Sequence, residues 1–64
     1  MNEYVIYHEF GRRKLTSKEN YDTVMRNASK IIDMSNFSSD ASAKQYLIDN
    51  WKLLENQIKI IDKS

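Results

Sequence analysis

The chain has 64 residues, and a domain of this size buries only about 60% of the surface that its unfolded form exposes, so little core is left to enclose a deep pocket. It contains no cysteine and a single histidine, which excludes disulfide bonds, thiolate nucleophiles and the usual zinc sites. Ten Lys or Arg side chains stand against nine Asp or Glu, so the total charge favours neither a nucleic-acid coat nor an acidic mimic of DNA.

Residues 3–10, EYVIYHEF, predict a β-strand, because aromatic and β-branched side chains fill a run of strand length. Successive side chains of a strand point to opposite faces. One face, expected in the core, holds Tyr4, Ile6, His8 and Phe10, and the other, expected to be solvated, holds Glu3, Val5, Tyr7 and Glu9. Gly11 suits the left-handed position of a hairpin turn with a glycine bulge, so residues 12–16 are expected to form a short returning strand.

A first helix is predicted over residues 17–33. Thr16 and Glu19 have the spacing of a capping box, and apolar residues then recur at intervals of three and four. This apolar stripe consists of Tyr21, Val24, Met25, Ala28, Ile31 and Ile32. The segment MSNFSSD interrupts the pattern and predicts a turn, with Ser38, Ser39 or Asp40 as the cap of the next helix.

A second helix is predicted over residues 40–62, where apolar side chains follow heptad spacing. A helix of about 23 residues would be about 34 Å long, which exceeds the diameter of roughly 28 Å expected for a compact domain of this size. Part of its apolar stripe should therefore remain uncovered by its own chain. The expected association surface consists of Tyr46, Trp51, Leu54, Ile58 and Ile61. In the alternative, the helix ends at Asp49 and Asn50, and WKLLENQIKII folds back.

The sequence therefore predicts a single α+β domain over residues 1–64, with a strand or β-hairpin at about 3–16 followed by two antiparallel helices, the second of them long. No hydrophobic run approaches the roughly 20 residues that span a bilayer, and the N-terminus lacks the pattern of a signal peptide, so we expect a cytoplasmic protein with no membrane partner. Its many Lys, Asn, Ile and Tyr residues are typical of phage or mobile-element genes.

No catalytic, cofactor or metal site is predicted. His8 has no second histidine, cysteine or clear carboxylate partner in the sequence, which favours a structural role. Glu3 and Glu9 share a strand face but lie about 20 Å apart along an extended chain, too far for a paired general acid and base. The serines occupy cap and turn positions without a nucleophile motif. We therefore expect a protein that is not an enzyme.

Positive charge is concentrated between residues 12 and 30, where six cations against two anions give +4. The cations are Arg12, Arg13, Lys14, Lys18, Arg26 and Lys30. Such a run can bind phosphates or the carboxylates of a partner, or it can be an ordinary solvated surface.

Two functions are compatible with these patterns. The first is a small regulatory or inhibitory protein that binds and occludes a protein partner and also forms a dimer, because the predicted second helix carries more apolar surface than its own chain can cover. The alternative is a dimeric nucleic-acid-binding regulator that uses the basic segment 12–30, with Tyr4, Tyr7 and Phe10 stacking on unpaired bases.

Overall fold

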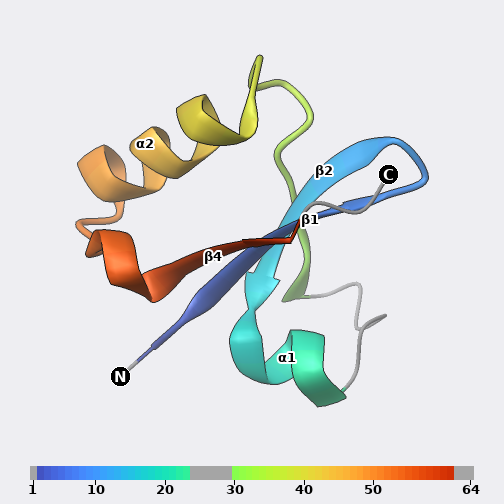
Figure 1. The fold of residues 1–64 in the computed structure, drawn as a ribbon, viewed down its shortest axis with the longest axis horizontal. Helices are drawn as coiled ribbons and strands as arrows, with labels where there is room; N and C mark the ends of the chain where they lie inside the picture. Colours follow the sequence, from blue (N-terminus) through green and yellow to red (C-terminus); the bar gives the residue numbers. More distant parts are fainter. Residues whose placement is uncertain (1, 24–29, 62–64) are drawn as a thin grey trace.

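The computed structural model describes residues 2–23 and 30–61, and its centre is a four-stranded mixed sheet (Figure 1). The strand order is β3-β2-β1-β4, with β1 antiparallel to β2 and parallel to β4, and β3 antiparallel to β2. The strands are β1 Tyr4–Glu9, β2 Arg12–Ser17, β3 Ile32–Asp33 and β4 Ile58–Ile61. The helices of the described residues are α1 Lys18–Thr23, α2 Asp40–Asn50 and the 3-10 turn η2 Glu55–Gln57.

Strands β1 and β2 form a β-hairpin, as the sequence predicts for the first part of the chain. Glu9 pairs with Arg12, so the turn consists of Phe10 and Gly11 alone. Both turn residues have a positive φ, 53° for Phe10 and 76° for Gly11, a combination typical of type I′ turns. The twist of this turn matches that of the flanking strands, so the hairpin closes without the predicted glycine bulge.

The predicted pair of antiparallel helices, the second of them long, is wrong. Ile32 and Asp33, expected at the end of the first helix, form the edge strand β3. The second helix starts at Asp40 as predicted but ends at Asn50, and its expected last turns at residues 58–61 are strand β4. Residues 24–29, which include three members of the predicted first stripe, lie outside the described residues.

Local hydrogen bonds explain where the two helices begin. Ser39 caps α2, because the backbone N–H of Ser42 donates to Ser39 Oγ and the backbone N–H of Ser39 donates to Ser42 Oγ, each at 3.1 Å. At α1 the cap is Ser17, whose Oγ accepts from the backbone N–H of Asn20 at 3.2 Å. The predicted cap Thr16 is instead a buried residue of β2.

The end of α2 and the start of β4 follow from backbone conformation and side-chain shape. Lys52 has a φ of 59°, so the chain leaves the helix directly after Trp51. Residues 58–61, IKII, contain three β-branched side chains, which favour a strand over a helix. They pair in parallel with β1, whose residues lie more than 50 positions earlier in the chain.

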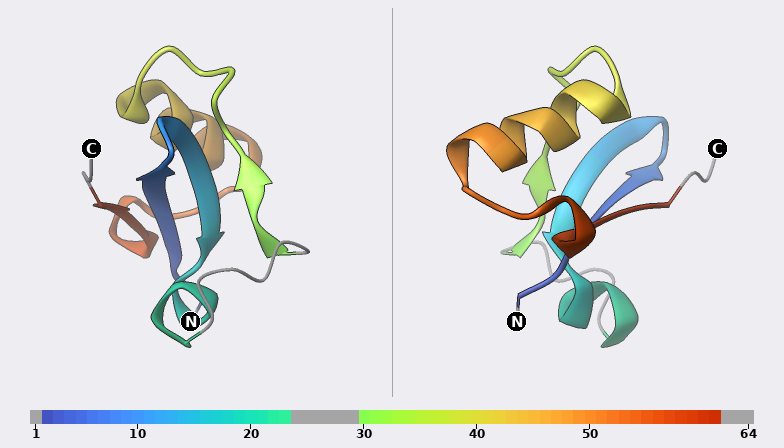
Figure 2. Two further views of the ribbon diagram at one scale, coloured as in Figure 1. Left: turned by 90° about the vertical axis from the view of Figure 1, so that its right-hand side faces the viewer. Right: turned by 60° about the vertical axis from the view of Figure 1, so that its left-hand side comes forward.

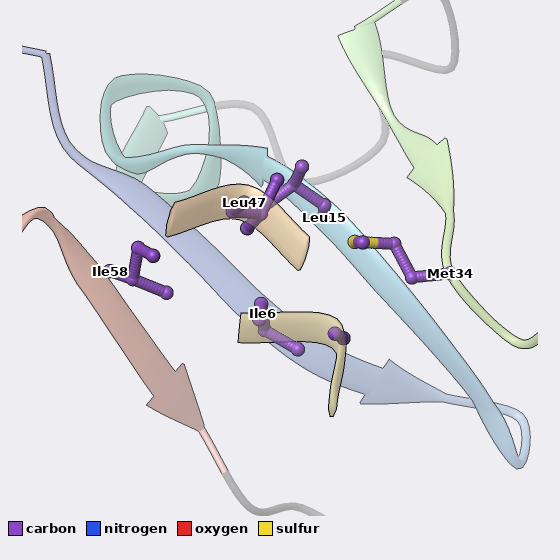
Figure 3. Close-up of a cluster of buried hydrophobic side chains, with 6 residues drawn as sticks. Ile6, Leu15, Met34, Leu47 and Ile58 are labelled. Carbon is purple, nitrogen blue, oxygen red and sulfur yellow. The ribbon is translucent and has the colours of Figure 1, made fainter. Parts of the chain in front are cut away.

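The main core lies between α2 and one face of the sheet, which we call the α2 face (Figures 2 and 3). Its buried side chains are Ile6, Leu15, Met34, Ala43, Leu47 and Ile58. The opposite face, where a solvated surface was expected, is also buried at Val5 and Tyr7. The Tyr7 ring lies 5.3 Å from the ring of Tyr21 in α1. Phe10, expected in the core, is 84% exposed.

Candidate functional site

A single helix cannot cover the α2 face of a four-stranded sheet. A helix with its side chains is about 10 Å wide, whereas neighbouring strands lie about 4.8 Å apart, so one helix covers roughly two strands. Helix α2 lies over the central strands β1 and β2 (Figure 3). Apolar side chains on the outer strands consequently remain exposed on this face, namely Ile32 on β3 and Ile60 on β4.

The uncovered surface on the β3 side forms an apolar groove of about 270 Å³, which we call the α2–β3 groove. Its apolar lining consists of Leu15, Ile32, Met34, Phe37, Tyr46 and Trp51. Leu15 and Met34 are buried, whereas Ile32, Tyr46 and Trp51 are exposed along its length. A smaller hollow of about 120 Å³ shares Leu15, Ile32 and Trp51 and extends the groove toward Lys30. The side chains that line the groove come from α2, from two strands and from the loop between β3 and α2.

Aromatic contacts hold the α2 wall of the groove in place. The Trp51 ring meets the Tyr4 ring of β1 nearly at right angles, with ring centroids 5.6 Å apart. The Tyr46 ring lies 5.0 Å from the ring of Phe37, in the loop that precedes α2. Each pair of rings joins separate parts of the chain, so these contacts fix the positions of Trp51 and Tyr46 in the wall of the groove.

A larger hollow of about 470 Å³ lies near the N-terminus, but its lining differs in kind. Its lining is mostly charged or polar and consists of Asn2, Glu3, Tyr4, Ser17, Lys18, Glu19 and Asp22. Two of these residues, Lys18 and Asp22, already pair with each other at 2.6 Å. Pairs of this type lie on many solvated surfaces and carry little free energy. The α2–β3 groove is therefore the better candidate for a binding site.

The residues of the expected association surface are divided among a helix, a loop and a strand. Tyr46 and Trp51 line the α2–β3 groove, and Leu54 lies outside it with 60% of its surface exposed. Ile58 is buried in the core, and Ile61 is half-buried in β4. Because Ile58 pairs with Tyr4 and Ile61 pairs with Tyr7, these two isoleucines face opposite sides of the sheet.

The expected basic patch is also divided. Arg12 and Lys14 face away from α2, whereas Arg13 lies on the α2 face, since neighbouring residues of a strand alternate. Lys30 is exposed, and Arg26 lies outside the described residues. Most of the described cations stand close to a carboxylate. The pairs are Arg12 with Asp33 at 3.6 Å, Arg13 with Asp40 at 2.5 Å, Lys14 with Glu9 at 3.0 Å and Lys18 with Asp22 at 2.6 Å. This pairing weakens the attraction of the segment for phosphates.

Asp40 is the centre of a polar cluster that the sequence does not reveal. Its Oδ1 atom accepts a hydrogen bond from Arg13 Nε and lies 3.0 Å from His8 Nε2. Arg13 also donates to the carbonyl oxygen of Phe37 at 2.7 Å, and its side chain is only 13% exposed. The hydrogen bond from Arg13 lowers the pKa of Asp40; burial acts in the opposite direction, and the contact with His8 lowers the pKa further.

The position of this cluster favours a structural role. His8 and Arg13 are directly opposite each other on β1 and β2, and Asp40 is the first residue of α2, so the cluster fastens the start of α2 to the hairpin. His8 thus has the carboxylate partner that its sequence neighbourhood lacks, but a single oxygen of this carboxylate contacts both His8 and Arg13. Among the described residues, no group of three or more His, Asp or Glu could hold a metal ion.

Four apolar residues of the groove were not predicted as part of a site, namely Leu15, Ile32, Met34 and Phe37. Ile32 fits the apolar stripe of the predicted first helix, so the sequence pattern gave no sign that it lies in an edge strand. Phe37 did carry a signal, because it is the one aromatic residue in the polar segment MSNFSSD. A large apolar side chain in a turn often contacts either the core or a partner.

Comparisons of the chain with protein-family models, with curated proteins and with solved structures give no significant match. In the part of the chain that the structure describes, no helix combines the length and apolar character required to cross a bilayer. The function must therefore be argued from the geometry of the surface.

Proposed function

We propose that the chain is a small protein-binding module whose α2–β3 groove accepts an extended apolar segment of a protein partner. The observation that carries the proposal is the position of exposed aromatic side chains beside an edge strand. Trp51 and Tyr46 form one wall of the groove, and Ile32 of β3 forms the other. Tyr and Trp are the side chains most often found as binding hot spots.

The edge strand favours an extended ligand over a helical one. β3 has a strand neighbour only on its β2 side among the described residues. An extended segment can pair with such an edge through its backbone and place alternate side chains into an adjoining pocket. Since β3 is only two residues long, side chains in the groove would supply most of the contact.

By occupying a segment of its partner, the module would act as a regulator or inhibitor of that protein. The sequence also predicts a homodimer, in which a second copy of the chain could cover the groove. Light scattering separates the two, because a homodimer raises the molecular mass of the isolated chain as its concentration increases.

The proposal can be tested with random peptides displayed on phage and selected on the immobilised chain. Trp51 is the only tryptophan and lines the groove, so its fluorescence reports binding of each selected peptide directly. We expect enriched peptides to carry aromatic or aliphatic residues at alternate positions. Tyr46→Lys should weaken their binding by at least about tenfold.

Leu54→Lys is the matched control, because it places the same charge on another exposed apolar position outside the groove. It should leave the peptide affinity within about twofold of the original value. Selection of no related peptides, or equal losses in the two variants, would show that the groove is not a peptide-binding site.

A further inference from the structure

The tip of the β1–β2 hairpin presents a phenylalanine that the fold itself does not need. Phe10 is the most exposed large apolar residue of the described chain, at 84%. It also has a φ of 53°, in the left-handed region that bulky side chains rarely adopt. The first central position of a type I′ turn favours Asn, Asp or Gly, and Asn followed by glycine is the preferred sequence. Phe10 is therefore unfavourable at this position both for its backbone conformation and for its exposure to water.

We infer that Phe10 is an anchor that inserts into an apolar pocket of a protein partner whose rim carries carboxylates. Strained backbone conformations and exposed aromatic side chains are both concentrated at functional sites. The turn has only two residues and joins two paired strands, so the ring is presented on a rigid support and little conformational entropy is lost on binding.

The charges beside the tip favour a protein over a nucleic acid or a lipid surface. Arg13 and Lys14 are partly buried, and each lies within 3.0 Å of a carboxylate. Arg12 has the most accessible side chain of the three, at 66%, and lies 3.6 Å from Asp33. The three cations are thus matched by three carboxylates, which leaves little net charge to attract a phosphate backbone or an anionic bilayer. The pair of Arg12 with Asp33 is long and exposed, so this one guanidinium can also bind a single carboxylate at the rim of the pocket, whereas a phosphate backbone or a bilayer is bound by several cations at once.

This inference shares with the proposed function only the premise that the ligand is a protein. Phe10 does not line the α2–β3 groove. Variants at position 10 therefore test the anchor, whereas Tyr46→Lys tests the groove. Peptides that bind the groove should bind the Phe10→Asn variant as tightly as the original chain.

The first test measures stability alone. Phe10→Asn replaces an unfavourable turn residue with the preferred one, so it should raise the Tm by roughly 4–8 °C. A lower Tm in this variant would show that Phe10 stabilises the fold, and the inference would fail.

The second test identifies what the ring contacts. The chain is prepared with p-benzoylphenylalanine in place of Phe10, irradiated in an extract of the cells that produce it, and the cross-linked residues are identified by mass spectrometry. The inference predicts a cross-link to apolar residues of one protein, blocked by an excess of the original chain and not by an excess of Phe10→Asn. The purified partner should then bind Phe10→Asn at least about tenfold more weakly than the original chain and bind Phe10→Tyr about as tightly.

A chain with the same photoreactive residue at Asn56, an exposed position in η2, controls for accidental contacts. Cross-links to nucleic acid or lipid, to another copy of the chain alone, or to the same proteins from both positions would each overturn the inference. So would the absence of any cross-link that the original chain can block.

Discussion

Replacement of Asp40 by Asn removes the negative charge from the cluster that fastens α2 to the hairpin, and it should destabilise the protein strongly. Arg13 would keep its hydrogen bond to the carbonyl of Phe37 but lose its ionic partner, and only 13% of its side chain reaches solvent. A hydrogen bond to a charged group contributes about 1.5–3 kcal/mol, so the free energy of unfolding should fall by about 2 kcal/mol. This is a large fraction of the roughly 3–5 kcal/mol that a domain of this size gains from its core.

Thermal unfolding followed by circular dichroism measures the effect, which should lower the Tm by about 8–16 °C. Asp22→Asn is the matched control, because it removes the same charge from another close ion pair, with Lys18 at 2.6 Å. That pair is exposed and lies within one helix, so its loss should lower the Tm much less than Asp40→Asn does. Equal losses in the two variants would refute the argument that burial of Arg13 sets the size of the effect.

The pH dependence of the same variant gives a second check. The pKa of Asp40 is lower in the folded state than its ordinary value, so its contribution to stability is complete above the unfolded pKa of about 3.9. That contribution is lost as the pH falls through the lower pKa of the folded state. Because Asn resembles the protonated acid, the original chain and Asp40→Asn should differ most between pH 5 and 7, on the order of 2 kcal/mol, and the difference should shrink as the pH falls below about 3.9. A difference that stays constant down to pH 2 would contradict this account.

Four further substitutions test the core packing, the hairpin turn and the helix cap. Leu47→Ala should lower the free energy of unfolding by about 2–5 kcal/mol and Leu54→Ala by less than about 0.5 kcal/mol in urea titrations, because Leu47 is buried and Leu54 is exposed. Gly11→Ala should cost about 1 kcal/mol in the same measurement although no atom beyond its two chain neighbours lies within 4 Å of the added carbon, since the φ of 76° alone opposes a side chain. Ser39→Ala should cost about 1 kcal/mol and reduce helical circular dichroism, and an unchanged signal would mean that its cap does not hold the start of α2.

The sequence predicts local features of this fold well, because local chemistry determines them. Gly11 follows a strand pattern, so the hairpin between residues 4 and 17 could be expected from the turn alone. Ser39 was likewise among the predicted caps of α2. In both the hairpin turn and the helix cap, the residues that determine the structure lie within a few positions of one another. Neither feature depends on which other part of the chain packs over it.

The second helix was predicted too long because apolar residues can follow heptad spacing in a segment that is not one continuous helix. Leu47 belongs to a helix, Leu54 to a loop, and Ile58 and Ile61 to a strand, yet their intervals suit one continuous stripe. The β-branched run at residues 58–61 was the local sign of a strand. Its pairing partner β1 lies at the other end of the chain, so only the three-dimensional fold could decide between the two structures.

The candidate groove depends on the same long-range pairing. Exposed apolar surface was expected because a long helix would extend beyond a small domain, and that reason is wrong. The surface instead results from the number of strands, since β3 and β4 widen the sheet beyond the reach of α2. The sequence shows that Trp51 is apolar, but it does not show whether other residues cover the side chain. That depends on how far the sheet extends beyond β1 and β2, the two strands under α2. A second helix packed over Ile32 would close the groove, so the exposure of its aromatic wall follows from the strands that a single helix leaves uncovered.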